Sequence, residues 1–428
     1  MFKKLNDLPN WQRNIYILWF GTFMIGVGSG EVLPFLSLFT ETLGNFTKAE
    51  VNLYSGIAFS STFLMTAIVS PIWGKLADRV GRKPMLIRAA LGMAVVYTLT
   101  GFSTSVWVLI GLRFLMGFFN GYVSNANALV AKDTPKIYSG HALGIVVTGY
   151  TSGALIGPLL GGFLANIFGY RMPFFITGSI FFLLTFLTLI GVHEDKSTLV
   201  TEKPTGKQPS ALKSAKYPMM VFGLFITSMI VNLVTNSINP ILSQYVRQLL
   251  EPNESHLSMI AGLIAAAPGM TAIIFAPRFG RLGDRIGSEK LVIGGFLIGI
   301  VSMIPMAFVS NVWVLFVLRL FIGLTTAAMN PAIQAILAHE TPQEFTSRIF
   351  SYNQSFLAMG NVFGPLLGSL VANIFDYRGV FIVSGIMIMI NLIVSLLFPN
   401  SFGSVVQIVN CSKSVIVFQR SHFLQSDD

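Results

Sequence analysis

Long apolar runs separated by short polar segments recur along the whole chain of 428 residues. A helix that crosses about 30 Å of hydrocarbon needs roughly 20 predominantly apolar residues, so these runs are suited to span a membrane. An outer-membrane barrel would instead show alternating segments of about ten residues. The pattern predicts an all-α integral membrane protein with twelve spans, near residues 15–39, 53–73, 85–102, 106–130, 139–166, 172–192, 217–245, 257–277, 291–309, 312–337, 346–374 and 379–397.

The chain repeats itself across a polar connector that is rich in lysine and proline. The loop at 74–83 returns as a near copy at 280–290, 206 positions later, and Arg113 and Arg319 keep the same spacing. A repeat of this kind predicts two similar six-helix bundles with a cavity where they meet. The expected boundaries are 1–192 for the first bundle, 193–216 for the connector, 217–398 for the second bundle and 399–428 for a tail.

Composition excludes a water-soluble enzyme, because 53% of the residues are hydrophobic and only 11% are charged. The net charge of +10 is explained by position, since most Lys and Arg residues fall in the two ends, the even-numbered loops and the connector. The positive-inside rule then places both ends, the connector and the tail in the cytoplasm. The one cysteine, Cys411, excludes an intramolecular disulfide and a cysteine-based metal or redox site.

The two copied loops carry candidate gating residues. Their glycines permit tight turns, the aspartate can pair with an arginine or a helix N-terminus, and the basic residues can hold the loop at an anionic membrane surface. The loop at 74–83 resembles the G-x-L-x-D-R-x-G-R-K signature of the major facilitator superfamily, which implies that it holds the two bundles in one access state. The alternative is a basic turn that only sets topology. The residues concerned are Gly74, Asp78, Arg79, Gly81, Arg82, Lys83, Gly280, Asp284, Arg285 and Gly287.

Two charged residues within apolar runs are candidates for proton coupling. Arg113 lies in the fourth run, where an unpaired charge is costly. Followed by Gly117 and Gly121, it resembles the helix-4 pattern of the superfamily, whose drug–proton antiporters associate this arginine with proton coupling. Glu31, in the first run, is a candidate proton carrier or contact for a cationic substrate. The alternatives are an Arg113 that extends to the membrane surface and a Glu31 that faces only an outer vestibule.

A glycine stripe marks the fifth run. Glycines at every fourth position fall on one face of a helix and allow another helix to approach closely, and a proline beside them adds a kink. The pattern resembles the helix-5 signature of exporters in the superfamily, so it implies outward transport; ordinary packing of small residues is the alternative. Its members are Gly149, Gly153, Gly157, Pro158, Gly161 and Gly162.

Amide and aromatic side chains in the apolar runs suggest the character of the central cavity. Amides in hydrocarbon need partners, so some of them are expected to bond between helices. Others are expected to line an apolar, aromatic pocket with scattered hydrogen-bonding groups. The candidates for this wall are Phe35, Phe59, Phe119, Asn120, Asn127, Tyr150, Asn232, Asn236 and Asn353.

The resemblance covers about residues 10–397 and extends to the branch of twelve-span drug–proton antiporters, since stretches at 124–129 and 351–356 look like the MdtG and PmrA group of bacterial multidrug exporters. It implies a non-enzymatic exporter of amphipathic drugs in exchange for protons, and a role in antibiotic resistance. Its expected partners are small amphipathic substrates, protons and the lipid bilayer of the bacterial plasma membrane, without nucleic acid, and the expected state is a monomer. The chain carries no phosphate-loop motif of nucleotide-hydrolysing pumps, and no cofactor or metal is expected. The alternatives are a nutrient or metabolite symporter of the same fold and a transport-inactive membrane receptor or scaffold.

Overall fold

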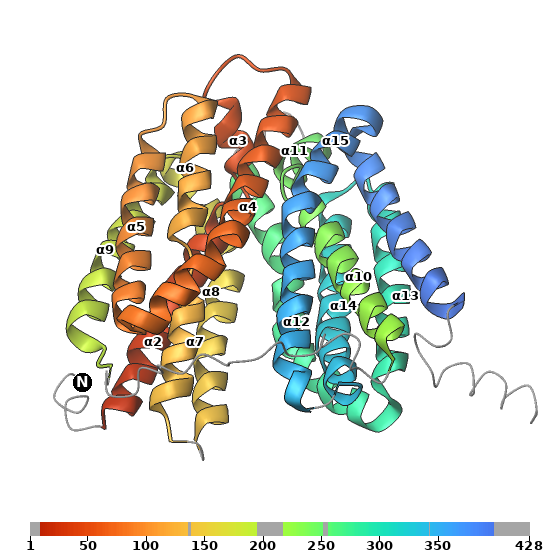
Figure 1. The fold of residues 1–428 in the computed structure, drawn as a ribbon. Helices are drawn as coiled ribbons and strands as arrows, with labels where there is room; N and C mark the ends of the chain where they lie inside the picture. Colours follow the sequence, from red (N-terminus) through yellow and green to blue (C-terminus); the bar gives the residue numbers. More distant parts are fainter. Residues whose placement is uncertain (1–8, 136–137, 195–216, 251–255, 342, 398–428) are drawn as a thin grey trace, which may run out of the picture.

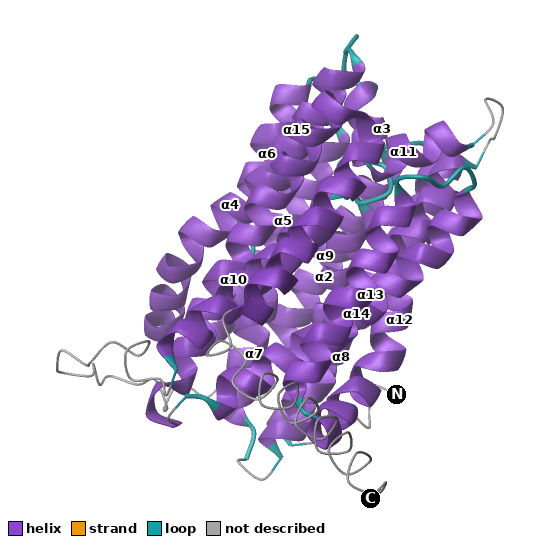
Figure 2. Cartoon of the chain, turned by 90° about the vertical axis from the view of Figure 1, so that its right-hand side faces the viewer, coloured by secondary structure: helices purple, strands orange, loops and turns teal. Residues whose placement is uncertain are grey.

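The computed structural model of the chain describes residues 9–135, 138–194, 217–250, 256–341 and 343–397. Within these ranges the secondary structure is helical, without strands (Figure 2). The helices are α2 (Asn10–Glu31), α3 (Leu36–Glu41), α4 (Lys48–Val80), α5 (Arg82–Gly101), α6 (Val106–Phe119), α7 (Tyr122–Asp133), α8 (Ser139–Phe168), α9 (Met172–Gly191), α10 (Pro218–Ser237), α11 (Leu242–Leu249), α12 (Leu257–Ile286), α13 (Ser288–Met306), α14 (Val312–His339) and α15 (Gln343–Leu397).

The helices form two groups that stand side by side, α2 to α9 and α10 to α15 (Figure 1). Each group has its own apolar core: one core is built from buried side chains between Ile15 and Val192, and the other from buried side chains between Met220 and Leu392. The predicted connector, apart from His193 and Glu194, and the predicted tail lie outside the described residues.

Ten helical segments of the described chain are long and apolar enough to cross a membrane, with α6 and α7 counted together as Val106–Asp133, which confirms the all-α membrane fold. One of them, α15, contains Asp376 with a φ of 60°, a non-helical residue that divides it into two segments. The helix α2 is not among the ten, because its glycines and its polar residues Asn14 and Glu31 dilute the apolar side chains of the first predicted span.

The first span of each half is broken, where the sequence predicts one helix. The chain leaves α2 at Glu31 and resumes in α3, and it leaves α10 at Ser237 and resumes in α11. Pro34 and Pro240 lie in the two breaks, 206 positions apart, and proline lacks the backbone N–H that a continuous helix requires. A proline therefore lies at the interruption of the first span in both halves.

The fourth predicted span is also broken, whereas its counterpart in the second half, the tenth predicted span, is not. Helix α6 ends at Phe119 and α7 begins at Tyr122, whereas α14 continues through the corresponding stretch. Gly121 adopts a φ of 123°, a conformation that disfavours residues with a Cβ atom. The second half has Ala327 and Ala328 at spacings of 206 and 207, and both remain helical.

The two groups of helices meet at the end that carries α3 and α11, which lie close together in both views (Figures 1 and 2). There the Asn52 amide donates to the Asn373 side chain at 3.1 Å, and the Ser60 hydroxyl donates to the carbonyl oxygen of Val362 at 2.7 Å. Gly74 and Gly280, from the two predicted gating loops, lie within α4 and α12, and a Cβ atom placed on either would have no heavy atom within 4 Å. The described contacts thus close the molecule at the α3 and α11 end.

Candidate functional site

A cavity of about 250 Å³ lies between the two groups of helices. Most of its wall comes from the first half, and the second half contributes two amides at the end of α10. The lining residues are Ser29, Gly30, Val32, Leu33, Phe59, Thr62, Phe63, Met93, Tyr97, Arg113, Met116, Asn120, Tyr150, Ala154, Asn236 and Asn239. The wall combines aromatic rings and apolar side chains with a few hydrogen-bonding groups, which is the usual make-up of a small-molecule site.

Four of the nine residues predicted for this wall line it in the structure: Phe59, Asn120, Tyr150 and Asn236. Asn236 is held by a chain of amides, since it donates to Asn361 at 2.9 Å and accepts from Asn239 at 3.0 Å. The contribution of the second half to the wall is thereby fixed by hydrogen bonds among its own amides.

The other five predicted wall residues lie elsewhere. Phe35 packs inside the first core, with its ring centroid 5.5 Å from that of Phe174. Phe119 packs against Gly92 of α5, and the Asn232 amide donates back to its own helix. Asn353 is 2% exposed, and Asn127 is partly buried, but neither lines the cavity. Sequence spacing identified polar helix faces without showing which of them turn toward the cavity.

Arg113 lies in the cavity wall and is 6% exposed, so it does not extend to the surface of the molecule. Its Nη1 contacts the sulfur of Met116 at 3.5 Å, and its guanidinium lies 5.6 Å from the ring centroid of Phe174. Its Nε and Nη2 atoms have no hydrogen-bond partner among the described residues. A buried cation with free donors beside a cavity can bind an anionic or hydrogen-bond-accepting group.

Glu31 is 1% exposed at the break of the first span. Its Oε2 atom accepts a hydrogen bond of 2.5 Å from the Thr177 hydroxyl, and its Oε1 has no partner among the described residues. The described ion pairs do not include a bridge between Glu31 and Arg113. A buried carboxyl group without a direct ion-pair partner among the described residues can hold a proton, because its charged form is costly away from water.

The second half contains a neutral copy of this pair. Ser237 stands 206 positions after Glu31, Ser384 stands 207 positions after Thr177, and their hydroxyls lie 3.2 Å apart. Sequence reasoning missed Thr177, although the hydroxyl shared with Ser384 across the repeat was a usable signal. Both halves therefore have a side-chain hydrogen bond at this position, but only the first half has an ionisable group there, Glu31.

Tyr97 lines the cavity and was not predicted from the sequence. Its hydroxyl donates to the carbonyl oxygen of Gly28 in α2, and its ring packs edge-on against Phe181. This contact joins α5 to the glycine-rich end of α2, one turn before Glu31. No periodicity in the sequence distinguishes this tyrosine from others.

Arg319, the counterpart of Arg113, is also buried but does not line the cavity. Its Nε atom donates to the carbonyl oxygen of Ile264 at 3.4 Å, inside the second core. The two arginines thus occupy equivalent places in the repeat and different environments.

The glycine stripe packs helix α8 against helix α2. A Cβ atom on Gly149, Gly153, Gly157 or Gly161 would collide with the carbonyl oxygens of residues 19, 23, 27 and 31, each four positions after the last. Contact this close between two backbones requires glycine. Gly162 faces the other way and packs on Ser258 and Gly262 of α12, so the motif also forms part of the contact between the two halves.

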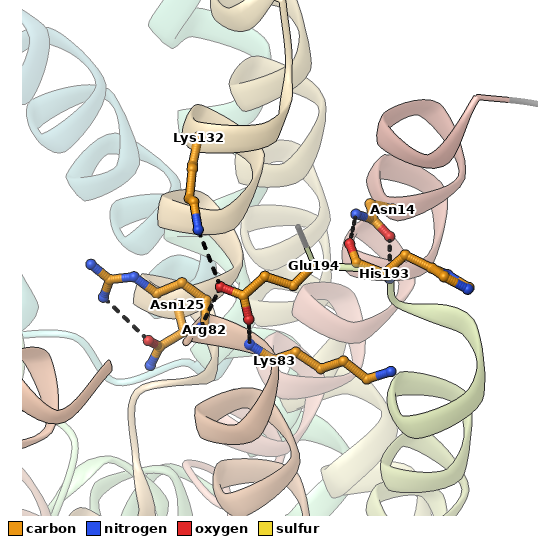
Figure 3. Close-up of polar contacts among 7 residues, drawn as sticks. All are labelled: Asn14, Arg82, Lys83, Asn125, Lys132, His193 and Glu194. Carbon is orange, nitrogen blue, oxygen red and sulfur yellow. Dashed lines mark hydrogen bonds and ion pairs between the residues drawn. The ribbon is translucent and has the colours of Figure 1, made fainter. Parts of the chain in front are cut away.

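The first gating loop is tied to the end of the first bundle by Glu194, another residue that sequence reasoning missed (Figure 3). The Glu194 carboxylate accepts hydrogen bonds of 2.8 Å from the backbone N–H groups of Arg82 and Lys83, at the N-terminus of α5, and lies 3.6 Å from the Lys132 ammonium. A carboxylate at a helix N-terminus satisfies free N–H groups and interacts favourably with the helix dipole. The neighbouring His193 exchanges two hydrogen bonds with Asn14 of α2.

The other predicted loop residues are only partly placed. Gly81 and Gly287 have φ values of 101° and 98° and form the matching turns between α4 and α5 and between α12 and α13. Arg79 and Arg285 lie exposed in the last turns of α4 and α12. Asp78 and Asp284 lie on those helices, but their side chains are outside the described part of the structure.

A membrane protein with two repeated bundles and a cavity between them has the architecture of a secondary transporter. A family model described as Major Facilitator Superfamily matches residues 18–250 and 224–408. The chain therefore belongs to the Major Facilitator Superfamily, and it is a multi-pass bacterial membrane transporter, not an enzyme.

Two relatives show its place in the superfamily. The chain is 46% identical to multidrug resistance protein MdtG of Proteus mirabilis, over 90% of this chain and 96% of that protein. It is 45% identical to MdtG of Enterobacter lignolyticus, over 90% of this chain and 92% of that protein. The expected resemblance to the MdtG group is confirmed.

Solved structures share the fold at low sequence identity. A bacterial homologue of the human lysosomal transporter Spinster, in an inward-facing and unoccupied conformation, matches with a TM-score of 0.76 and 15% identity, over 92% of this chain and 98% of that chain. The nucleoside transporter NupG matches with a TM-score of 0.75 and 13% identity, over 90% of this chain and 98% of that chain.

Proposed function

We propose that the protein exports amphipathic drugs or other toxic compounds across the bacterial plasma membrane in exchange for protons, by alternating access. The observation that carries this proposal is the identity of about 45% to multidrug resistance proteins over nine-tenths of the chain. The aromatic and amide-containing cavity between the bundles supports it, since amphipathic molecules need apolar walls with scattered hydrogen-bonding groups.

In this proposal, Glu31 carries the proton and Arg113 couples its binding to the substrate. Both are buried in the first bundle, and each has at least one polar atom without a partner among the described residues. Protonation of Glu31 and occupation of the cavity would compete or alternate, so that inward proton movement drives outward drug movement. One charge that crosses the membrane gains about 2.3 kcal/mol per 100 mV, which sustains drug gradients of tens-fold.

The proposed topology has both ends and the connector in the cytoplasm and a monomer as the working unit. The gating loops then lie at the cytoplasmic face, and the closed α3 and α11 end faces outward. This arrangement agrees with the placement of Lys and Arg residues and with the fold shared with an inward-facing transporter.

Efflux of a fluorescent cationic dye from cells, with and without a protonophore, tests direction and energy source together. We expect the expressed protein to lower dye accumulation and the protonophore to abolish the difference. Dye uptake driven by the same gradient would instead support the symporter alternative. Absence of both transport and substrate-induced proton flux would support the scaffold.

A further inference from the structure

Arg88 occupies an unusual place at the break of the fourth span. It extends from α5 to the chain between α6 and α7, where its Nη2 atom donates to the carbonyl oxygens of Phe119 at 3.3 Å and Asn120 at 3.1 Å. Its Nη1 atom lies 3.5 Å from the carbonyl oxygen of Phe118. These carbonyl groups are at the end of α6, where regular helical partners are missing because the chain turns at Gly121. Arg88 therefore supplies hydrogen bonds that the broken helix lacks.

The arginine is itself held in position by Trp73 of α4. Its guanidinium carbon lies 3.7 Å from the centroid of the Trp73 ring, and the indole N–H of Trp73 donates to the carbonyl oxygen of Phe118 at 2.8 Å. A guanidinium stacked on tryptophan gains a cation–π interaction, which partly compensates for its removal from water. Arg88 and Trp73 act together on the same carbonyl group.

The internal repeat provides a comparison within one chain. At a spacing of 206, Arg88 corresponds to Gly294 and Trp73 corresponds to Phe279, while alanine stands in place of Gly121. In that second half, α14 is continuous. The break, the arginine and the tryptophan are thus present together in one half and absent together from the other, so the arginine belongs to the break rather than to the general fold.

The break also determines the position of Asn120, which lines the cavity and immediately precedes Gly121. The side-chain oxygen of Asn120 accepts a hydrogen bond from the Gly121 N–H at 2.7 Å, and its side-chain NH2 group donates to the Thr66 hydroxyl at 3.3 Å. This amide group has two hydrogens, so one N–H remains for a ligand in the cavity that Asn120 lines. In a continuous helix, the backbone at this position would follow a different path.

We propose that Arg88 is a positioning residue for substrate selection: it stabilises the break at Asn120 and Gly121 and so presents the Asn120 amide to substrates that accept a hydrogen bond. The inference rests on the proposed drug export. It assigns to this part of the wall a preference for molecules that carry a carbonyl or similar acceptor beside their apolar body.

The test compares two lipophilic cations, a xanthene dye that carries an ester carbonyl and tetraphenylphosphonium, which has no acceptor. For Arg88→Gly, we expect the KM for efflux of the ester dye to rise several-fold with little change in kcat, and the KM for tetraphenylphosphonium to stay near that of the wild type.

Asn120→Ala should reproduce this pattern. Arg88→Lys should recover part of the affinity, because the ammonium group can still donate to the freed carbonyls. An equal fall in kcat for both cations, at unchanged KM, would contradict the inference.

Hydrogen exchange provides a readout that does not depend on transport. We expect the amides of residues 119–125 to exchange faster in Arg88→Gly than in the wild type. In the double variant Arg88→Gly with Gly121→Ala, a continuous helix can form as in α14, so protection should return. Ala327→Gly is the matched control in α14 and should leave residues 119–125 unchanged. Unchanged exchange in Arg88→Gly would refute the positioning role. If the variants show the expected exchange pattern but the wild-type protein exports neither cation, only the proposed function is refuted.

Discussion

Glu41 and Arg247 stand 206 positions apart, at equivalent places in the two halves, and pair with each other across the contact between the bundles. The Nη1 atom of Arg247 lies 3.1 Å and 2.8 Å from the two carboxylate oxygens of Glu41. One position of the ancestral repeat thus carries opposite charges in its two copies. Because the pair joins α3 to α11, it must separate when the bundles part at this end.

Neutralisation of the pair should favour opening at the α3 and α11 end. Both side chains are about 40% exposed, so the interaction contributes at most about 1 kcal/mol and Glu41→Gln should shift the access equilibrium by up to about five-fold. Maleimide labelling of Ser243→Cys, in a background without Cys411, measures the shift, since Ser243 is fully buried where it donates to the carbonyl oxygen of Pro34.

The exchange of charges, Glu41→Arg with Arg247→Glu, is the matched control. It restores the attraction, so labelling should return toward the wild-type rate. Equal labelling in all of these variants would show that the pair does not affect the access equilibrium.

Glu31→Gln should abolish the dependence of efflux on the proton gradient and lower transport at least ten-fold, because the amide cannot carry a proton. Proton flux into proteoliposomes on addition of substrate is the measurement. Ser384→Ala, which removes one hydroxyl of the neutral copy in the second half, should leave coupling intact. Wild-type pH dependence in Glu31→Gln would remove this residue from the mechanism.

Glu194→Ala should destabilise the first bundle by about 0.5–2 kcal/mol, the usual effect of removing a side-chain cap from a helix N-terminus. The variant also leaves Lys132 without its described partner carboxylate. Thermal unfolding of the purified protein in detergent measures the loss. Glu289→Ala, in the first turn of the corresponding helix α13, is the control and should have a smaller effect; equal effects would contradict the capping role.

Asp78→Asn should strongly reduce drug efflux while membrane insertion stays normal, since the first gating loop matches every position of the superfamily signature. Efflux normalised to the amount of inserted protein is the measurement. Asp284→Asn tests the second loop, which departs from the signature at Ser288 and Glu289, and should be milder. Normal efflux by well-expressed Asp78→Asn would refute a gating role for the first loop.

The sequence by itself determined the membrane class, the duplicated plan and the superfamily. Runs of about 20 apolar residues are rarely anything other than membrane helices. A spacing of 206 or 207 between matching glycines, prolines and arginines can be recognised without knowing which residues are in contact. Local chemistry also marked Arg113, Glu31 and the glycine stripe, because charges in hydrocarbon and glycines at every fourth position are rare without a structural or functional reason.

Only the tertiary structure decided which of these side chains meet. Thr177 reaches Glu31 from 146 positions away, and Glu194 reaches the turn at Arg82 from 112 positions away. Helical periodicity indicates that a residue lies on a polar face, but the neighbour of that face depends on how separate helices pack. For the same reason, four predicted wall residues line the cavity and five do not, and the break that orients Asn120 depends on an arginine supplied by another helix.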